Sequence, residues 1–121
     1  MEFDVEYYEA FNGKQYAREF LDYLESKNEE LWTIALALIK NLKYEKYHVL
    51  PYSRALRGGL LEIRPRAGKN ICRINYCFAG KQKILLLNGF IKNDKKTQER
   101  EIAKARKLMQ ECKERIKEKY A

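Results

Sequence analysis

Residues 60–91 decide the fold, and they read LLEIRPRAGKNICRINYCFAGKQKILLLNGFI. Three stretches have the alternating pattern and the β-branched and aromatic content of strands: Leu60–Arg66, Ile71–Ala79 and Lys83–Ile91. The short polar segments between them contain Gly68 and Gly80, which is typical of hairpin turns. These residues therefore predict an antiparallel three-stranded meander. Its last strand is apolar at consecutive positions, Ile84–Leu87, which predicts a central strand covered on both faces.

The segment before the meander predicts one strand and a helical hairpin. Phe3–Tyr8 has strand-like content and ends near the turn signal Asn12-Gly13. Lys14–Ser26 carries apolar residues on one helical face, and Ser26-Lys27-Asn28-Glu29 has the form of a capping box that starts a second helix, which continues to Leu42. Tyr44–Gly59 has no period and is interpreted as a connecting loop, with Gly58-Gly59 as a bend.

The segment after the meander predicts one long helix with Thr97 as its N-cap. Its apolar positions are spaced by three and four residues, which favours a core stripe or a groove for a partner: Ile102, Ala105, Met109, Cys112 and Ile116. Together these elements predict an α+β fold. A chain of 121 residues is long enough for one hydrophobic core, so residues 1–121 are expected to form a single domain.

Several classes of protein are disfavoured by composition. No apolar run reaches the roughly 18 residues of a membrane span, and the acidic N-terminus lacks the features of a secretory signal, so a cytoplasmic protein is expected. The three cysteines have no C-x-x-C spacing, and His48 is the only histidine, so neither a metal site nor a cofactor is predicted. The motifs of nucleotide-binding loops and of serine hydrolases are absent.

The net charge of +8 is concentrated in one part of the chain. Residues 1–53 carry 6 basic and 10 acidic side chains, residues 54–96 carry 11 and 2, and residues 97–121 carry 8 and 5. A concentrated positive field attracts polyanions and speeds their capture. The middle segment therefore favours binding to nucleic acid over a surface that is basic only for solubility.

A cationic face is predicted from the meander. Arg64 and Arg66 point the same way from one strand, while Arg73 and Asn75 point away from the apolar residues of the next. Lys92, Lys95 and Lys96 follow the third strand and are expected in the same neighbourhood. An unpaired cluster of this kind repels itself, which favours a phosphate-binding site over scaffold, although solvated side chains on an open sheet face remain the alternative.

The chemistry open to this face is limited. Glu62 and Asp94 are the only acids in the basic segment, and no second acid lies near either in sequence, so metal-assisted hydrolysis is disfavoured. RNA offers another route, because its 2′-hydroxyl can attack the adjacent phosphate while the protein orients the strand and stabilises charge. Lysine and arginine side chains are sufficient for that task. RNA is therefore the favoured partner.

Four ordered blocks resemble the HigB branch of the RelE/ParE toxin superfamily. They are LRGGLLEIR at 56–64, CRINY at 72–76, LLLNGFIK at 85–92 and KKT at 95–97 with Glu101-Ile102 and Ala105. The branch reads approximately L-x-G-L-[YW]-E-L-R, Y-R-[VI]-x-Y, L-L-H-x-F-x-K-K and T-x-K-T-P-x-x-E-I-x-x-A. The order of strand, two helices, three strands and a C-terminal helix also matches. Departures are Cys72 for tyrosine, Asn88 for histidine, Asn93 for the second lysine and Gln98 for proline.

The resemblance implies a RelE-like fold and a type II toxin that cuts mRNA on the ribosome and inhibits translation without a metal or cofactor. It implies a cognate antitoxin, expected to be of the helix-turn-helix type, and contact with operator DNA only through the toxin–antitoxin complex. Carried over by position, the catalytic residues would be Arg64, Arg73 and Lys92. The expected RNA-binding residues are Arg57, Arg66, Asn75, Lys95 and Lys96.

Two alternatives remain open at this point. A ParE-like toxin that poisons gyrase has the same fold and another target. A non-catalytic module could hold nucleic acid through the basic face and Tyr76. An RNA cleavage assay separates the enzyme from the binding module.

Overall fold

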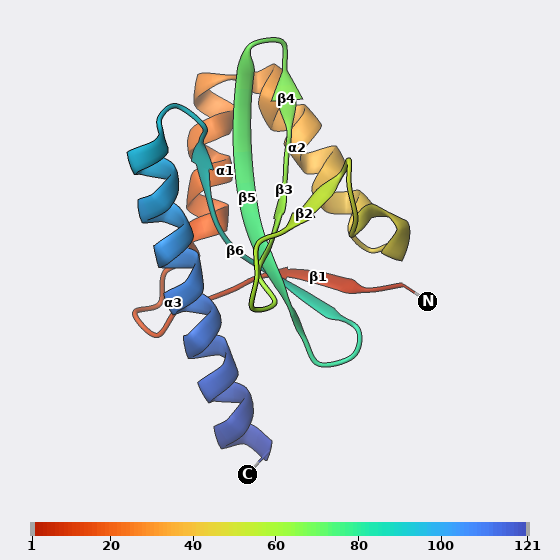
Figure 1. Ribbon diagram of the computed structural model, residues 1–121, viewed down its shortest axis with the longest axis vertical. Helices are drawn as coiled ribbons and strands as arrows, with labels where there is room; N and C mark the ends of the chain where they lie inside the picture. The colour runs from red at the N-terminus through yellow and green to blue at the C-terminus, as the bar shows by residue number, and fades with distance from the viewer. Residues whose placement is uncertain (1, 121) are drawn as a thin grey trace.

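The protein forms one mixed sheet with a helical hairpin and a long C-terminal helix (Figure 1). A computed structural model describes residues 2–120, with side chains as far as residue 116. The helices are α1 (Tyr16–Lys27), α2 (Glu29–Asn41), the short 3-10 helix η1 (Glu45–Tyr47) and α3 (Lys95–Tyr120). The strands are β1 (Asp4–Tyr7), β2 (Ser53–Ala55), β3 (Leu61–Ile63), β4 (Arg66–Ala67), β5 (Asn70–Ala79) and β6 (Lys83–Ile91). The predicted α+β fold is confirmed.

The sheet has the strand order β1-β6-β5-β3-β2, and β4 pairs with β5 beyond the end of β3. β1 runs parallel to β6, whereas the other pairs are antiparallel. β6 therefore lies inside the sheet, between β1 and β5. Ile84 and Leu86 pack in one apolar cluster and Leu87 in another, so the expectation of a strand covered on both faces is confirmed.

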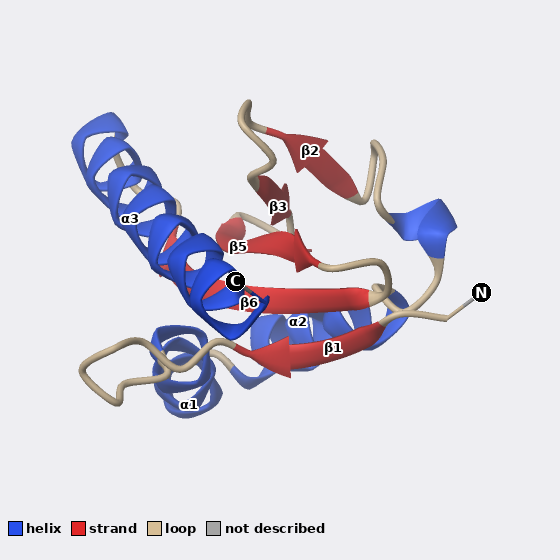
Figure 2. Cartoon of the chain, turned by 90° about the horizontal axis from the view of Figure 1, so that it is seen from below, coloured by secondary structure: helices blue, strands red, loops and turns tan. Residues whose placement is uncertain are grey.

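The helical hairpin seals one face of the sheet. Leu21 and Leu24 of α1 and Leu31 and Ala35 of α2 are buried against inward-facing residues of the central strands, among them Cys72, Ile74, Tyr76, Ile84 and Leu86. We call this the hairpin face. α3 packs on the other face through Ala105, Leu108, Met109 and Cys112 (Figure 2). No helix in the described part of the chain is long and apolar enough to cross a membrane.

Two predicted helix starts are wrong by a few residues. Asn28, not Ser26, caps α2: its side chain accepts a hydrogen bond from the Leu31 amide, while the Ser26 hydroxyl donates to the Tyr23 carbonyl of α1. Asp94, not Thr97, precedes α3 and accepts hydrogen bonds from both the amide and the hydroxyl of Thr97. In each case a polar side chain other than the predicted one reaches the free amides of the first turn. The bonds from Thr97 hold the pKa of Asp94 below its usual value.

Two strand boundaries also differ from expectation. The predicted loop Tyr44–Gly59 contains η1 and the edge strand β2, whose three residues are too few to show a period. The predicted strand Leu60–Arg66 is divided into β3 and β4 by Arg64 and Pro65. Proline has no amide hydrogen to give to a ladder, and its carbonyl instead accepts from the Cys72 amide.

Candidate nucleic-acid interface

The face of the sheet opposite the helical hairpin is only partly covered by α3. Strand pairing places Arg54 opposite Glu62 and Glu62 opposite Asn75, so all three belong to this face. Arg73 lies two residues from Asn75 on β5, and Arg64 and Arg66 lie two and four residues beyond Glu62. We call this face of the sheet, which carries Arg54, Arg64, Arg66 and Arg73, the arginine face. The predicted strand parity is confirmed, because Cys72, Ile74 and Tyr76 enter the opposite core.

Three of these arginines converge on one open pocket. Arg64, Arg66 and Arg73 line it together with Pro51, and its volume is about 270 Å³. We call it the arginine pocket. Arg66 is exposed and Arg64 is half-buried, with a buried Nε that has no hydrogen-bond partner. Since no acidic side chain of the described residues lines this pocket, the site offers guanidinium groups to an anion.

Arg73 is held in place by a buried acid. Its side chain is only 4% exposed, its Nε lies 3.6 Å from Oε2 of Glu62, and its Nη1 donates to the Cys72 carbonyl at 3.0 Å. Burial lowers the pKa of Arg73, Glu62 opposes that effect, and Arg64 and Arg66 lower the pKa further. The expectation of an unpaired arginine lying outside the core is wrong, because Glu62 comes beside Arg73 through the pairing of β3 with β5.

Asn75 is a structural residue rather than a surface one. It is completely buried, and its Nδ2 donates to Oδ1 of Asn88, whose own Nδ2 donates to the Glu101 carbonyl of α3. This chain of amides ties β5 and β6 to α3. The expectation that Asn75 binds RNA does not fit this burial, because the side chain has no surface to offer a ligand.

The buried polar atoms under the pocket are not all satisfied. Oε2 of Glu62 and Oδ1 of Asn75, like Nε of Arg64, have no hydrogen-bond partner among the described residues. Burying a polar group without a hydrogen bond costs free energy. All three atoms belong to side chains on the arginine face.

The predicted lysines do not line the pocket, and Lys92 is the one whose backbone is linked to the same strand residue as Arg66. The amide of Lys92 donates to the Ile71 carbonyl, while Ile71 pairs with Arg66 on its other side, so Lys92 and Arg66 flank the same residue of β5. Lys95 and Lys96 are exposed in the first turn of α3. These cations extend the positive surface from the pocket toward the start of α3.

Arg57 lies at a different end of the arginine face. It has a positive φ of 77° in the turn between β2 and β3, and its carbonyl accepts a hydrogen bond from Nη1 of Arg106 on α3. Nη2 of Arg106 donates to the Leu56 carbonyl, so Arg106 fixes this turn to the helix. The Arg57 side chain is exposed and does not line the arginine pocket.

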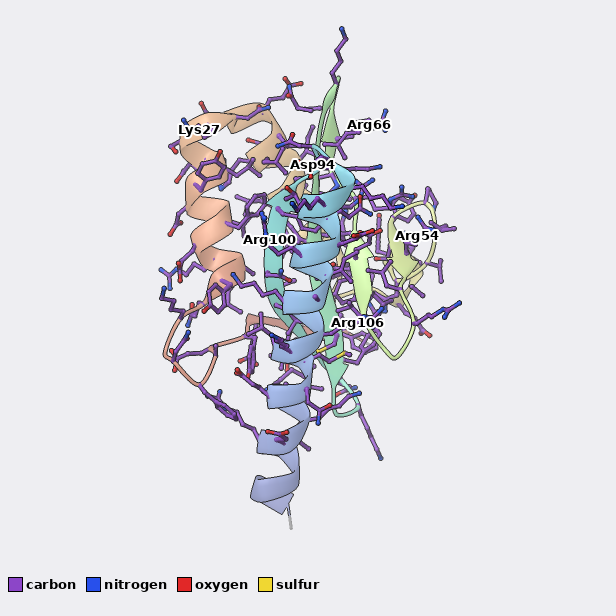
Figure 3. The ribbon with its side chains drawn as sticks, turned by 60° about the vertical axis from the view of Figure 1, so that its left-hand side comes forward. Lys27, Arg54, Arg66, Asp94, Arg100 and Arg106 are labelled. Carbon is purple, nitrogen blue, oxygen red and sulfur yellow. The ribbon has the colours of Figure 1, made fainter. Side chains whose placement is uncertain are left out.

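Sequence reasoning missed two contributors to the site. Pro51 lines the pocket and Arg54 faces Glu62, yet both come from the segment interpreted as a loop. Figure 3 shows Arg54 and Arg66 on the same side of α3, with Asp94 at the start of that helix. Alternation within 53–55 was the one signal that could have found Arg54, and three residues do not establish it.

Other regions offer less to a polyanion. A larger pocket of about 440 Å³ lies where α3 crosses the sheet edge, but its charged groups have partners: Lys83 pairs with Glu6, and Arg115 donates to the Glu9 carbonyl. No group of three or more His, Cys, Asp or Glu side chains within the described residues is placed to hold a metal ion. Nε2 of His48 hydrogen-bonds with the Leu42 carbonyl at 2.6 Å.

Comparison with known families covers most of these elements. Residues 19–110 match the family described as phage derived protein Gp49-like (DUF891), a range that includes most of α1, the arginine face and the first half of α3. None of the curated proteins matches the chain. Since the matched range covers well over half of the sequence, the chain belongs to the Gp49-like family, a RelE-like family associated with the toxins of toxin–antitoxin systems.

Proposed function

We propose that this protein is a HigB-like toxin of a type II toxin–antitoxin system, a metal-independent endoribonuclease that cuts mRNA on the ribosome and inhibits translation. The observation that carries the proposal is the arginine pocket, where three guanidinium groups meet and the part of the chain that the structure describes adds no acid to the lining. Membership of the Gp49-like family supports the toxin role. RNA-binding and cleavage are assigned to the arginine face.

The pocket suits transesterification within RNA. The 2′-hydroxyl gives its proton to water as its oxygen bonds to the adjacent phosphorus, the bond from phosphorus to the 5′-oxygen of the next nucleotide breaks, that oxygen takes up a proton from water, and a 2′,3′-cyclic phosphate remains. Negative charge grows on the phosphate oxygens in the pentacoordinate transition state. Guanidinium groups fixed before the reaction stabilise that charge without having to reorganise. Arg64 and Arg66 are accessible for this task, and Arg73 lines the same pocket.

Glu62 gives Arg73 a fixed orientation in this mechanism. The carboxylate lies near Nε and the Cys72 carbonyl accepts from Nη1, so two sides of the guanidinium are occupied. An arginine carries five N–H donors, and the remaining ones are free to meet phosphate oxygens. Arg73 is therefore a preorganised donor, while Lys92, Lys95, Lys96 and Arg57 are proposed to guide the RNA backbone on either side.

The proposal includes partners. A cognate antitoxin, expected to be of the helix-turn-helix type, neutralises the toxin by covering the arginine face or α3, and operator DNA is reached only through that complex. Expression of the toxin without its antitoxin should arrest growth, and coexpression should restore it. Healthy growth at high levels of soluble, folded protein would remove the toxin role.

The direct test is cleavage of a defined mRNA on programmed ribosomes. The parental protein should cut, and Arg64→Ala should lower the rate by about 10²-fold, the usual scale for losing one fixed charge-stabilising donor. Arg18→Ala is the matched control, because Arg18 is an exposed arginine on α1, which packs on the hairpin face. Cleavage by Arg64→Ala at the parental rate would show that the site is wrongly placed.

The same preparation separates the alternatives. If the protein leaves mRNA intact but inhibits DNA supercoiling by gyrase, the ParE-like alternative is the correct one. RNA-binding without cleavage by the parental protein would leave a non-catalytic module. Binding through the arginine face should weaken steeply as salt rises, because each neutralised phosphate releases counterions.

A further inference from the structure

An exposed apolar loop borders the arginine pocket. Between α2 and β2 the chain presents Val49 and Leu50, which are 61% and 62% exposed, and Tyr52, which is 41% exposed. We call residues 44–52 the tyrosine loop. Single exposed apolar residues are ordinary on a protein surface, but a contiguous group beside a binding site is typical of recognition.

The tyrosine loop is anchored rather than loosely attached. The Val49 carbonyl accepts hydrogen bonds from the amides of Tyr52 and Ser53. The Ser53 hydroxyl donates to the Tyr47 carbonyl at 2.8 Å and accepts from the buried hydroxyl of Tyr76 at 2.7 Å. The loop is therefore tied to the central strand β5 through side chains on the hairpin face.

Tyr47 and Tyr52 form an aromatic pair within this loop. Their ring centroids are 4.6 Å apart with an interplanar angle of 56°, so each ring limits the movement of the other. Lys46 places its ammonium 5.3 Å from the centroid of Tyr47, which adds a positive charge next to the pair. Tyr52 keeps much of its surface free for a ligand.

Backbone register brings the aromatic pair to the pocket. Pro51, the residue before Tyr52, is itself part of the pocket lining. Tyr52 also directly precedes Ser53, which pairs with Ile63, the residue before Arg64. An exposed aromatic residue therefore lies next to guanidinium groups that bind phosphate under the proposed function.

We infer that Tyr52, supported by Tyr47, is a platform on which an unpaired nucleobase of RNA stacks while a neighbouring phosphate occupies the arginine pocket. This inference rests on the proposed function and names the part of the substrate that the tyrosine loop recognises. A single-stranded polynucleotide combines flat apolar faces with closely spaced negative charges, and the loop and pocket present the complement of both. Stacking tolerates every base, so this platform adds affinity and register rather than a sequence preference.

The test uses two short RNA oligonucleotides of equal length at low salt, one with its bases and one abasic at the positions next to the bound phosphate. Replacing only the 2′-hydroxyl that would attack the bound phosphate by hydrogen prevents cleavage there, and a 2-aminopurine in the base-bearing strand reports stacking by fluorescence quenching. The parental protein should bind the base-bearing strand about tenfold more tightly, the scale of one base–aromatic contact. Its fluorescence should be quenched on binding.

Variants assign the effect to the loop. Tyr52→Ala should bind the base-bearing strand only as tightly as the abasic strand and should lose the quenching, whereas Tyr52→Phe should retain both. Tyr23→Ala is the matched control, because Tyr23 is 49% exposed on α1, which packs on the hairpin face. Thermal melting of each variant accounts for any loss of folded protein.

Four outcomes overturn the inference. Two concern the parental protein: equal affinity for the base-bearing and abasic strands, or unquenched 2-aminopurine fluorescence in the complex. Two concern Tyr52→Ala: an unaltered preference for the base-bearing strand, or normal RNA affinity together with lost binding of the antitoxin. The last result would make the loop a protein-docking surface. The proposed function is judged separately by mRNA cleavage on ribosomes, which can persist when stacking fails.

Discussion

The hairpin face and the arginine face of the sheet are built from the same strands, yet they differ in composition and in covering. On the hairpin face, α1 and α2 bury a continuous apolar cluster that includes Leu24, Ile74 and Ile84. On the arginine face, α3 covers Leu60, Cys77 and Leu87, while the other part holds charged and amide side chains. Strand alternation decides which face a residue joins. Helix coverage and the neighbouring strands then decide whether it can meet a ligand.

Arg73 and Arg64 show how helix coverage and neighbouring strands give two arginines of the same face different environments. Both belong to the arginine face, and both line the same pocket. Arg73 lies on the central strand β5 and is buried against Glu62, whereas Arg64 follows the end of β3 and keeps accessible surface. We therefore predict that Arg73 contributes both to the stability of the fold and to mRNA cleavage, whereas Arg64 contributes to cleavage with little effect on folding.

The largest expected effect follows from Arg73→Ala. Its removal leaves the Glu62 carboxylate buried without its partner, which should destabilise the protein by about 3 kcal/mol. Loss of a fixed phosphate donor should also lower mRNA cleavage by about 10²-fold or more, and Arg73→Lys should rescue it only in part. Chemical denaturation measures the first change, and cleavage on programmed ribosomes by the folded fraction measures the second.

A double variant separates the two roles of Arg73. Adding Glu62→Gln removes the uncompensated charge and should restore part of the stability without restoring cleavage. If cleavage returns along with stability, Arg73 acts only on the fold and the chemistry rests on Arg64 and Arg66. If Arg73→Ala is as stable as the parent, the ion pair does not hold the arginine face together.

The gathering of Arg64, Arg66 and Arg73 was predictable because it depends on local signals. The hairpin turns and the period of two in β5 are visible in the sequence, and together they bring these side chains to one face. The burial of Arg73 was not predictable in this way. It depends on which residue of β3 lies opposite Asn75, and nothing in the sequence alone sets that register.

The order of the main elements was predictable for the same reason, while the short ones were not. α1, α2 and α3 are long enough to show a helical period, and β5 and β6 are long enough to show strand content. β2 has three residues and lies within a segment that has no period, so the loop prediction for that segment is wrong for Arg54 and right for Pro51 and Tyr52. The helix starts were displaced because Ser26 and Asn28 are both acceptable caps, as are Asp94 and Thr97, and local geometry chooses between them.

A second prediction concerns the hairpin face, where packing should matter and charge should not. A Cβ added to Gly89 on β6 would meet the ring of Phe20 on α1 well inside normal contact distance. Gly89→Ala should therefore destabilise the protein by about 1–3 kcal/mol through overpacking. Cleavage per folded molecule should stay at the parental level. Denaturant unfolding measures the change in unfolding free energy, and mRNA cleavage on ribosomes measures the activity per folded molecule.

Phe20→Ala supplies the control for this contact. Truncating the ring makes room for the added methyl group, so Gly89→Ala should cost much less stability in that background than in the parental protein. Equal costs in both backgrounds would show that strain in β6 itself, and not the approach of α1, excludes a side chain. A loss of cleavage by folded Gly89→Ala would contradict the expectation that the hairpin face contributes to stability and the arginine face to cleavage.

The smallest expected effect tests the buried Tyr76 hydroxyl, which links the interior of the hairpin face to β2. Burial raises the pKa of Tyr76 to about 12 from its usual 10.0, and the Ser53 hydroxyl accepts a hydrogen bond from the neutral phenol. Because the folded pKa is the higher one, this contribution to stability is complete below pH 10 and is lost as the pH rises from 10 to 12. Tyr76→Phe has no such ionisation. The difference in unfolding free energy between parent and variant should therefore narrow by about 1 kcal/mol between pH 8 and pH 11. The pKa values of Tyr7 and Tyr8 are also raised, but these residues are present in both proteins and so affect both unfolding free energies alike. Urea titrations at each pH measure this difference in unfolding free energy. A difference that stays constant would mean that water reaches the Tyr76 hydroxyl in the folded protein, so that the helical hairpin does not exclude solvent from the hairpin face.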